Sequence, residues 1–281
     1  MPQRPPRGAR LAALAFATHL GPTIAVTTVA TLLGIVAGVT DRRLALLCVA
    51  VLAGQASIGW SNDWLDADRD RAVARSDKPV VQGAVRPTTL RSAALAAAAM
   101  AVVTSLLLGV VPGSLLLVLV ASGWAYNAGL KGTVASGLPY LTGFGALPAG
   151  VVAAAPGTPA APWWLVFAGA ALGGAAHLAN VAPDLDDDLA TGVRGLPHRL
   201  GAHVSAVLGA LLLGSASLVL VLGPPGPPTP AGWVCLAVAV PGVLLASLAG
   251  SRRFRRTAFP AVMILTVLDV LLLIAGGASV G

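Results

Sequence analysis

Long apolar stretches make up most of the chain, and short polar segments separate them. Nine stretches are mostly apolar and, at about 17 residues or more, long enough for helices that cross a lipid bilayer. They cover residues 11–38, 43–61, 89–109, 113–129, 135–155, 162–182, 201–222, 231–250 and 258–277. The pattern predicts an all-α fold, a polytopic membrane helical bundle with about nine transmembrane helices.

The composition supports a membrane protein. Apolar residues form 56% of the chain, charged residues only 10%, and the mean hydropathy is +0.83, whereas about 25% of a soluble domain is charged. The first apolar stretch is too long for the core of a signal peptide. We therefore expect one integral membrane domain over residues 1–281, with an N-terminal tail at about 1–10.

The basic residues predict the orientation of the bundle. With the N-terminus in the cytoplasm and the spans alternating, 16 of the 18 Lys and Arg residues face the cytoplasm, and only Arg42 and Arg43 do not. This agrees with the positive-inside rule, and an odd number of spans puts the C-terminus on the opposite side. Topology thus explains the net charge of +7 without nucleic acid. The expected partner is the bilayer, in the cell membrane of a bacterium.

Acidic residues gather in two places. All 11 are Asp, and nine of them lie within 63–77 or 184–188. Each place holds a triplet spaced by four residues. The first stripe is Asn62, Asp66 and Asp70, and the second stripe is Asn180, Asp184 and Asp188. Because four residues advance a helix by about 400°, each triplet would lie along one helix face. The predicted topology puts both stripes on the cytoplasmic side.

These acids indicate a cation site. Unpaired acids beside lipid are unfavourable, so we expect both stripes to line a water-filled cavity. Asp and Asn oxygens without a His or Cys cluster favour a hard cation, and Mg²⁺ usually combines one or two carboxylates with substrate phosphates and water. Two stripes therefore suggest two or more Mg²⁺ ions holding a diphosphate. Nearby basic residues are candidates for its oxygens. They are Arg75, Lys78, Lys131, Arg194 and Arg199.

Several other polar residues lie within the apolar stretches. Pro22 should kink the first helix and free backbone carbonyls, and His19 beside it is either a packed histidine or a cavity group. Tyr126 either belongs to an interfacial aromatic belt or contacts substrate. Asp269 should face the bundle interior, for packing or for function.

The two stripes resemble a known family. Asn62-Asp63-x-x-Asp66-x-x-x-Asp70, with Arg75, Lys78-Pro79 and Gly83, is similar to the first signature of the UbiA superfamily of intramembrane prenyltransferases. Asp184-x-x-x-Asp188, with Gly192 and Leu196-Pro197, resembles the second signature, and the segment from Tyr126 to Lys131 resembles the motif between them.

The resemblance implies nine helices around a central cavity, cytoplasmic Asp motifs that bind Mg²⁺, and transfer of an isoprenoid chain from an allylic diphosphate to an aromatic or other lipophilic acceptor. Its implied metal-binding residues are Asn62, Asp63, Asp66, Asp70, Asn180, Asp184 and Asp188. Its implied catalytic residues are Asp66, Asp70, Asp184 and Asp188. Its implied diphosphate-binding residues are Arg75, Lys78, Tyr126, Lys131 and Arg194. Two positions depart from the family pattern: Asn180 stands where many members have a carboxylate, and His19 is the candidate replacement for an arginine near the start of the first span.

Two other functions fit parts of the pattern. A terpene cyclase of the same architecture would trap the cation with the donor's own double bonds, whereas few aromatic residues, 5% of the chain, modestly favour an outside acceptor. A transporter would spread its acids toward the middle of the membrane. The Asp-Gly-x-x-Ala-Arg opening of CDP-alcohol phosphotransferases is absent from the sequence.

Overall fold

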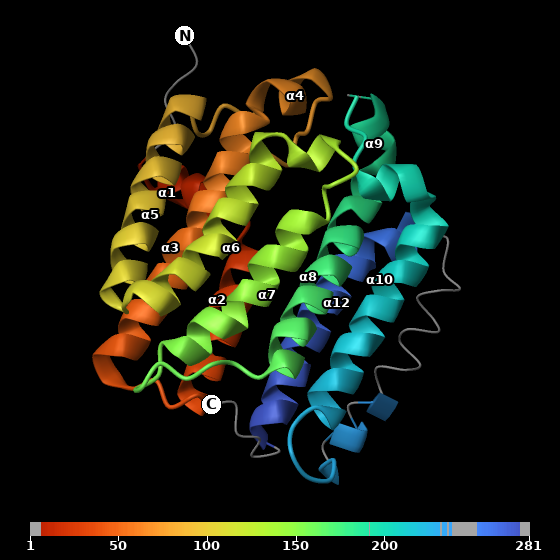
Figure 1. Ribbon diagram of the computed structural model, residues 1–281. Helices are drawn as coiled ribbons and strands as arrows, with labels where there is room; N and C mark the ends of the chain where they lie inside the picture. Colours follow the sequence, from red (N-terminus) through yellow and green to blue (C-terminus); the bar gives the residue numbers. More distant parts are fainter. Residues whose placement is uncertain (1–6, 191, 231, 235, 238–251, 276–281) are drawn as a thin grey trace.

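The computed structural model describes residues 7–190, 192–230, 232–234, 236–237 and 252–275. Their long helices run side by side in one bundle (Figure 1). In chain order the elements are α1 (Arg7–Phe16), α2 (Leu20–Val36), α3 (Asp41–Leu65), α4 (Ala67–Ala72), α5 (Pro87–Leu107), α6 (Val110–Ala128), η1 (Leu130–Gly132), α7 (Leu138–Ala153), α8 (Trp163–Val181), η2 (Ala182–Asp184), α9 (Leu185–Ala190), α10 (Leu196–Leu222) and α12 (Arg252–Ala275). No strand occurs among these residues, so the predicted all-α class is confirmed.

Eight of the nine predicted spans correspond to a helix or a bent helix pair. Within the described residues, five helices are long and apolar enough to cross a membrane, or six when α1 and α2 count as one bent span. The 16-residue α7 is shorter than such a span. The stretch 231–250 falls almost entirely outside the described residues, so the count of nine stays a prediction. Helix α1 begins at Arg7, within the predicted tail at about 1–10, and residues 1–6 of that tail lie outside the described residues.

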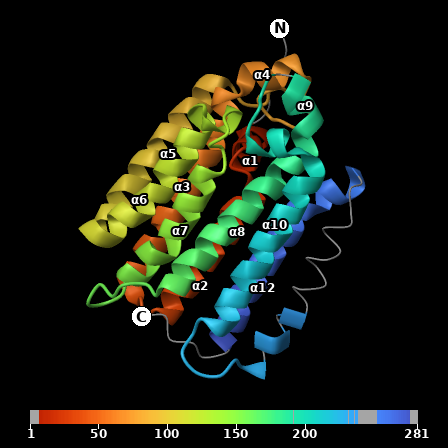
Figure 2. The ribbon, with the colours of Figure 1, turned by 45° about the vertical axis from the view of Figure 1, so that its right-hand side comes forward.

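Six helices close a ring around the centre of the bundle. Following the ring, α2 packs on α3, α3 on α6, α6 on α7, α7 on α8, α8 on α12 and α12 on α2. Helix α5 covers α3 from outside, and α10 covers α8 (Figure 2). A Cβ atom on Gly173 of α8 would lie 2.5 Å from the carbonyl oxygen of Tyr140 on α7. Such close contact through small residues is how helices pack in lipid.

The first predicted span is broken, as its proline indicated, but three residues earlier. Helices α1 and α2 meet at an angle of 65°, and His19 between them adopts a left-handed conformation, with φ 59° and ψ 64°. Pro22 has no N–H to donate to the carbonyl four residues back, that of Thr18. The hydroxyl of Thr23 donates to this carbonyl instead, at 2.8 Å. The break turns His19 toward the centre of the bundle.

Arg43, one of the two basic residues that depart from the positive-inside rule, has a structural role. Its guanidinium donates to the carbonyl of Leu108 at 2.7 Å and to that of Ala154 at 2.8 Å. These carbonyls follow the last residues of α5 and α7, where helices leave acceptors unsatisfied. One arginine on α3 thus ties together three helix ends on the side opposite the acids.

Candidate active site

The first stripe keeps its helical spacing although the helix does not continue unbroken. Helix α3 ends at Leu65 and the short α4 begins at Ala67. Asp66 lies at the junction, yet its N–H still donates to the carbonyl of Asn62 at 3.0 Å, and the N–H of Asp70 donates to the carbonyl of Asp66 at 2.8 Å. Asp66 and Asp70 are buried, with exposed fractions of 6% and 3%.

The second stripe follows the end of α8. Asn180 belongs to the last turn of α8, Asp184 closes the 3₁₀ turn η2, and Asp188 lies in α9. Helices α4 and α9 lie at the same end of the bundle, as predicted (Figure 1). All members of both stripes line one cavity.

Two arginines contact the stripes, and one of them, Arg69, contacts both. The guanidinium of Arg75 lies 3.1 Å from the carboxylate of Asp184 and also pairs with Asp77 at 3.0 Å. The guanidinium of Arg69 lies 3.0 Å from Asp66 and 4.0 Å from Asp188. Within the described residues, Arg69 and Arg75 thus offset part of the negative charge of the stripes.

Two lysines approach the first stripe from other segments. Lys131 of η1 donates to Asp66. Lys78 donates to Asp63 at 2.5 Å and lies 3.4 Å from the ring of His19. His19 itself lies 3.1 Å from Asp63, which is 1% exposed. The left-handed break therefore puts His19 among the charged groups of the site.

Burial perturbs the titration of several of these groups. Burial raises the pKa of Asp70, and the carboxylate of Asp66 raises it further, against the opposing effect of Lys78. Burial also raises the pKa of Asp188 and lowers that of Lys131, although the carboxylate of Asp66 opposes the second change. Hydrogen bonding to Asp77 raises the pKa of Arg75, so this group stays charged.

The donor set suits Mg²⁺. The stripes offer carboxylate and amide oxygens, which hard cations prefer. One oxygen of Asp70, Oδ2, is buried without a hydrogen-bond partner, and a buried carboxylate oxygen without a partner is unfavourable. Among the described residues, no three His, Cys, Asp or Glu side chains already converge at metal-binding distance. The basic side chains lie between the carboxylates and pair with them. For a metal ion to bind, the carboxylates must exchange these basic partners for the metal.

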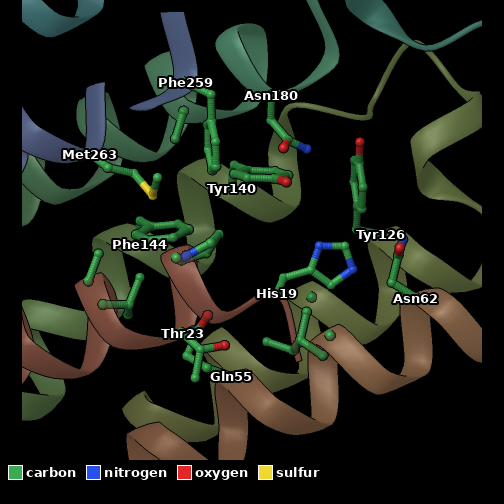
Figure 3. A pocket seen from close by; sticks show the side chains of 18 of the residues that line it. His19, Thr23, Gln55, Asn62, Tyr126, Tyr140, Phe144, Asn180, Phe259 and Met263 are labelled. Carbon is green, nitrogen blue, oxygen red and sulfur yellow. The ribbon is translucent and has the colours of Figure 1, made fainter. Parts of the chain in front are cut away.

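The acids form one end of a large cavity with a volume of about 660 Å³. Away from the acids its walls are mainly apolar and come from α2, α3, α6, α7, α8 and α12. Tyr126 and Tyr140 meet edge to face, with ring centroids 5.2 Å apart, and Figure 3 shows the hydroxyl of Tyr140 directed toward Asn180. The cavity thus combines a charged mouth with a long apolar interior.

Most predicted site residues come together here, and Arg194 and Arg199 do not. His19, Arg75, Lys78, Tyr126 and Lys131 line the cavity together with Asp63 and both stripes. Arg194 is exposed and is not among the lining residues. Its predicted contact with diphosphate therefore has no support in this arrangement.

Sequence reasoning missed two residues that contact the stripes. Arg69 lies three positions after Asp66, a spacing that puts both on one helix face and could have revealed the pair. His198 of α10 lies 3.3 Å from Asp188. No sequence spacing indicates this contact, because it depends on how α10 folds back on α9.

The fold and the site define an integral membrane enzyme whose apolar cavity opens at a mouth of acids and bases. The chain belongs to the UbiA prenyltransferase family, whose model matches residues 11–268. It is a prenyltransferase, an enzyme that transfers alkyl groups other than methyl.

Named relatives and solved structures agree with this assignment. A digeranylgeranylglyceryl phosphate synthase of Natronomonas pharaonis is 31% identical over 221 residues, which are 76% of this chain and 77% of that protein. A 4-hydroxybenzoate octaprenyltransferase of Herminiimonas arsenicoxydans is 29% identical over 168 residues, 58% of each chain. The structure of a UbiA homologue from Archaeoglobus fulgidus bound to GPP and Mg²⁺ has a TM-score of 0.68 at 14% identity, covering 94% of this chain and 99% of that chain. The structural likeness supports the same fold.

Proposed function

We propose that this protein is a Mg²⁺-dependent prenyltransferase that transfers an isoprenoid chain from an allylic diphosphate to an aromatic or other lipophilic acceptor. The observation that carries the proposal is the charged mouth of an apolar cavity, where two acid stripes and four bases meet. The two relatives support an aromatic or other lipophilic acceptor, because one is named as a digeranylgeranylglyceryl phosphate synthase and the other as a 4-hydroxybenzoate octaprenyltransferase. We place the mouth on the cytoplasmic side.

The stripes would hold the metal. Asn62, Asp66 and Asp70 from one side and Asp184 and Asp188 from the other offer the oxygens, with Asp63 and Asn180 beside them. Bound Mg²⁺ supplies positive charge that offsets the charge developing on the departing pyrophosphate. Bound Mg²⁺ would also give a partner to the buried Oδ2 of Asp70, which has no hydrogen bond in the structure.

The bases would bind the diphosphate. Arg75, Lys78 and Lys131 now donate to carboxylates, and the same N–H groups can donate to phosphate oxygens when the carboxylates turn to metal. Tyr126 lies beside them on α6. The apolar interior would hold the isoprenoid chain and keep water from the allylic cation until the acceptor is alkylated.

An assay of purified protein tests the proposal. With Mg²⁺ and geranyl, farnesyl or geranylgeranyl diphosphate, mass spectrometry should detect a prenylated adduct only when a phenolic or quinonoid acceptor is added. Asp66→Ala and Asp184→Ala should each abolish pyrophosphate release. Asp68→Ala is the matched control, because Asp68 lies two residues after Asp66, in α4, with its side chain 98% exposed.

Two outcomes would contradict the proposal. A cyclic hydrocarbon or alcohol formed from the donor alone would show a terpene cyclase. Near-normal turnover in Asp66→Ala would show that the first stripe is structural.

A further inference from the structure

Gln55 is a buried residue of the cavity wall whose amide faces the cavity. Gln55 lies on α3, is only 8% exposed and lines the cavity. In the part of the chain that the structure describes, no hydrogen bond joins its amide to another group. Its amide N and O are not among the buried polar atoms that lack a partner, so they are reachable from the cavity. A polar group in a mainly apolar wall is available to hydrogen-bond a molecule bound in the cavity.

The threonine hydroxyls that line the cavity donate their protons elsewhere and not to Gln55. Thr18, Thr23 and Thr266 also line the cavity, and each donates its hydroxyl proton to a main-chain carbonyl, those of Ala15, Thr18 and Val262. Thr23 and Gln55 are labelled in Figure 3. Gln55 thus offers the cavity both a donor and an acceptor that no described residue uses.

The depth of Gln55 distinguishes between the two substrates. Gln55 and Asn62 are seven residues apart, so they share a face of α3 and are separated by about 10 Å along it. A diphosphate held at the stripes continues at this depth as an apolar isoprenoid chain, which offers an amide no hydrogen bond. An acceptor reacts next to the departing diphosphate, and an oxygen elsewhere on its ring would reach deeper into the cavity.

The opposite wall suits a flat ring. Across the cavity from Gln55 are the rings of Tyr140 and Phe144, which stack with centroids 6.0 Å apart and an interplanar angle of 12° (Figure 3). Phe259 and Met263 of α12 lie beside them. Aromatic faces and a thioether favour a planar apolar partner. An amide, being neutral, pairs with a neutral hydroxyl or carbonyl oxygen at no cost in buried charge.

We propose that Gln55 selects the acceptor by hydrogen-bonding a neutral ring oxygen, a hydroxyl or a carbonyl, of an aromatic acceptor lying against Tyr140 and Phe144. The inference rests on the proposed function, since it requires a second substrate in the same cavity. Gln55 contributes to the binding and selection of the acceptor. Ionisation of the donor depends on the acids and bases at the mouth of the cavity.

A binding cycle tests the proposal without requiring turnover. The probes are 1-naphthol and naphthalene, which differ only by the hydroxyl, titrated into protein in nanodiscs with empty nanodiscs subtracted. In the unchanged protein, 1-naphthol should bind more tightly than naphthalene. Gln55→Met keeps the volume and removes the amide, so it should weaken 1-naphthol about tenfold, as expected for one net hydrogen bond, and leave naphthalene unchanged.

Gln82→Met is the matched control. Gln82 lies outside the cavity and its amide donates to the carbonyl of Ser76 at 2.6 Å, so neither probe should bind differently. Gln55→Met should also keep or raise the thermal stability, because it removes an unpaired amide and no hydrogen bond. If Gln55→Met does not fold, the difference between the probes in the unchanged protein still decides the question.

Three results separate this inference from the proposed function. Equal binding of both probes to the unchanged protein, or an equal loss of both in Gln55→Met, would overturn the role of Gln55 even if prenyl transfer is observed. Selective loss of 1-naphthol supports it, and a failure of every acceptor assay would then contradict only the transfer reaction. With an active acceptor, Gln55→Met should raise its KM about tenfold and leave the KM of the donor unchanged.

Discussion

The guanidinium of Arg75 lies 3.1 Å from the carboxylate of Asp184, although the two residues are 109 positions apart in the chain. The contact joins the loop after α4 to Asp184 of the second stripe in the turn η2. Arg69 makes the connection between the two stripes, from Asp66 to Asp188. Two stripes of like charge can stand side by side because cations from the chain lie between them.

Replacing Arg69 should weaken the protein most when no divalent ion is present. Arg69→Gln removes a cation that is 27% exposed and contacts both stripes, and we expect a loss of about 1–3 kcal/mol. Mg²⁺ should restore much of it, since it supplies the missing charge. Thermal unfolding in detergent, with chelator and then with increasing Mg²⁺, measures both effects.

Arg71→Gln is the control for that experiment. Arg71 is two positions away in the same short helix and pairs with Asp68, whose side chain is 98% exposed. Exposed pairs contribute about 0.2–1 kcal/mol, so its Mg²⁺ response should match that of the unchanged protein. Identical curves for Arg69→Gln and Arg71→Gln would show that Arg69 does not hold the stripes together.

Replacing Lys131 should reduce both stability and activity. Lys131→Met leaves buried Asp66 with Arg69 as its remaining cationic partner and removes a proposed phosphate contact. Combining it with Asp66→Asn should recover part of the stability, because the buried carboxylate is removed and Arg69 keeps Asp188 as a partner at 4.0 Å, but should not recover pyrophosphate release. Thermal unfolding and a pyrophosphate assay separate the two effects, and full activity of Lys131→Met would remove Lys131 from the site.

Gly59 is required where α3 passes the break between α1 and α2. A Cβ at this position would lie 2.3 Å from the carbonyl oxygen of Thr18, and a backbone atom cannot move as a flexible side chain can. Gly59→Ala should cost about 1–3 kcal/mol and displace His19 from Asp63, lowering activity. Gly8→Ala, where a Cβ meets nothing within 4 Å, should change neither thermal unfolding nor turnover.

Arg43 should matter for stability and little for chemistry. Arg43→Met removes two charge-assisted hydrogen bonds to main-chain carbonyls beyond the ends of α5 and α7, each worth about 1.5–3 kcal/mol. Arg42→Met, at the exposed neighbouring position, should be tolerated. Thermal unfolding compares the two, and equal stability would mean that water satisfies these carbonyls as well as Arg43 does.

The predicted orientation can be checked by cysteine labelling from either side of the membrane. In protein whose two natural cysteines are replaced, a cysteine at exposed position 68 should react from the cytoplasm. One at exposed position 226, in the loop after α10 at the opposite end of the bundle (Figure 1), should react from outside. Reaction of both from one side would contradict the topology.

The sequence by itself determined the helical class, the positions of eight helices or bent helix pairs, and the two acid stripes. Membrane helices must satisfy every backbone group internally, so a long apolar run permits little except a helix. The four-residue spacing of Asn62, Asp66 and Asp70 is equally local. It is kept even across the junction between α3 and α4, because the same hydrogen bonds persist there.

Only the tertiary structure decided which groups meet. The approach of Arg75 to Asp184, of His198 to Asp188 and of Lys131 to Asp66 depends on how separate segments pack. The position of Gln55 in the cavity wall also depends on tertiary structure, because the cavity exists only once the surrounding helices have packed. A spacing rule describes one helix, whereas pairing, burial and the shape of the cavity arise from the ring that six helices form together.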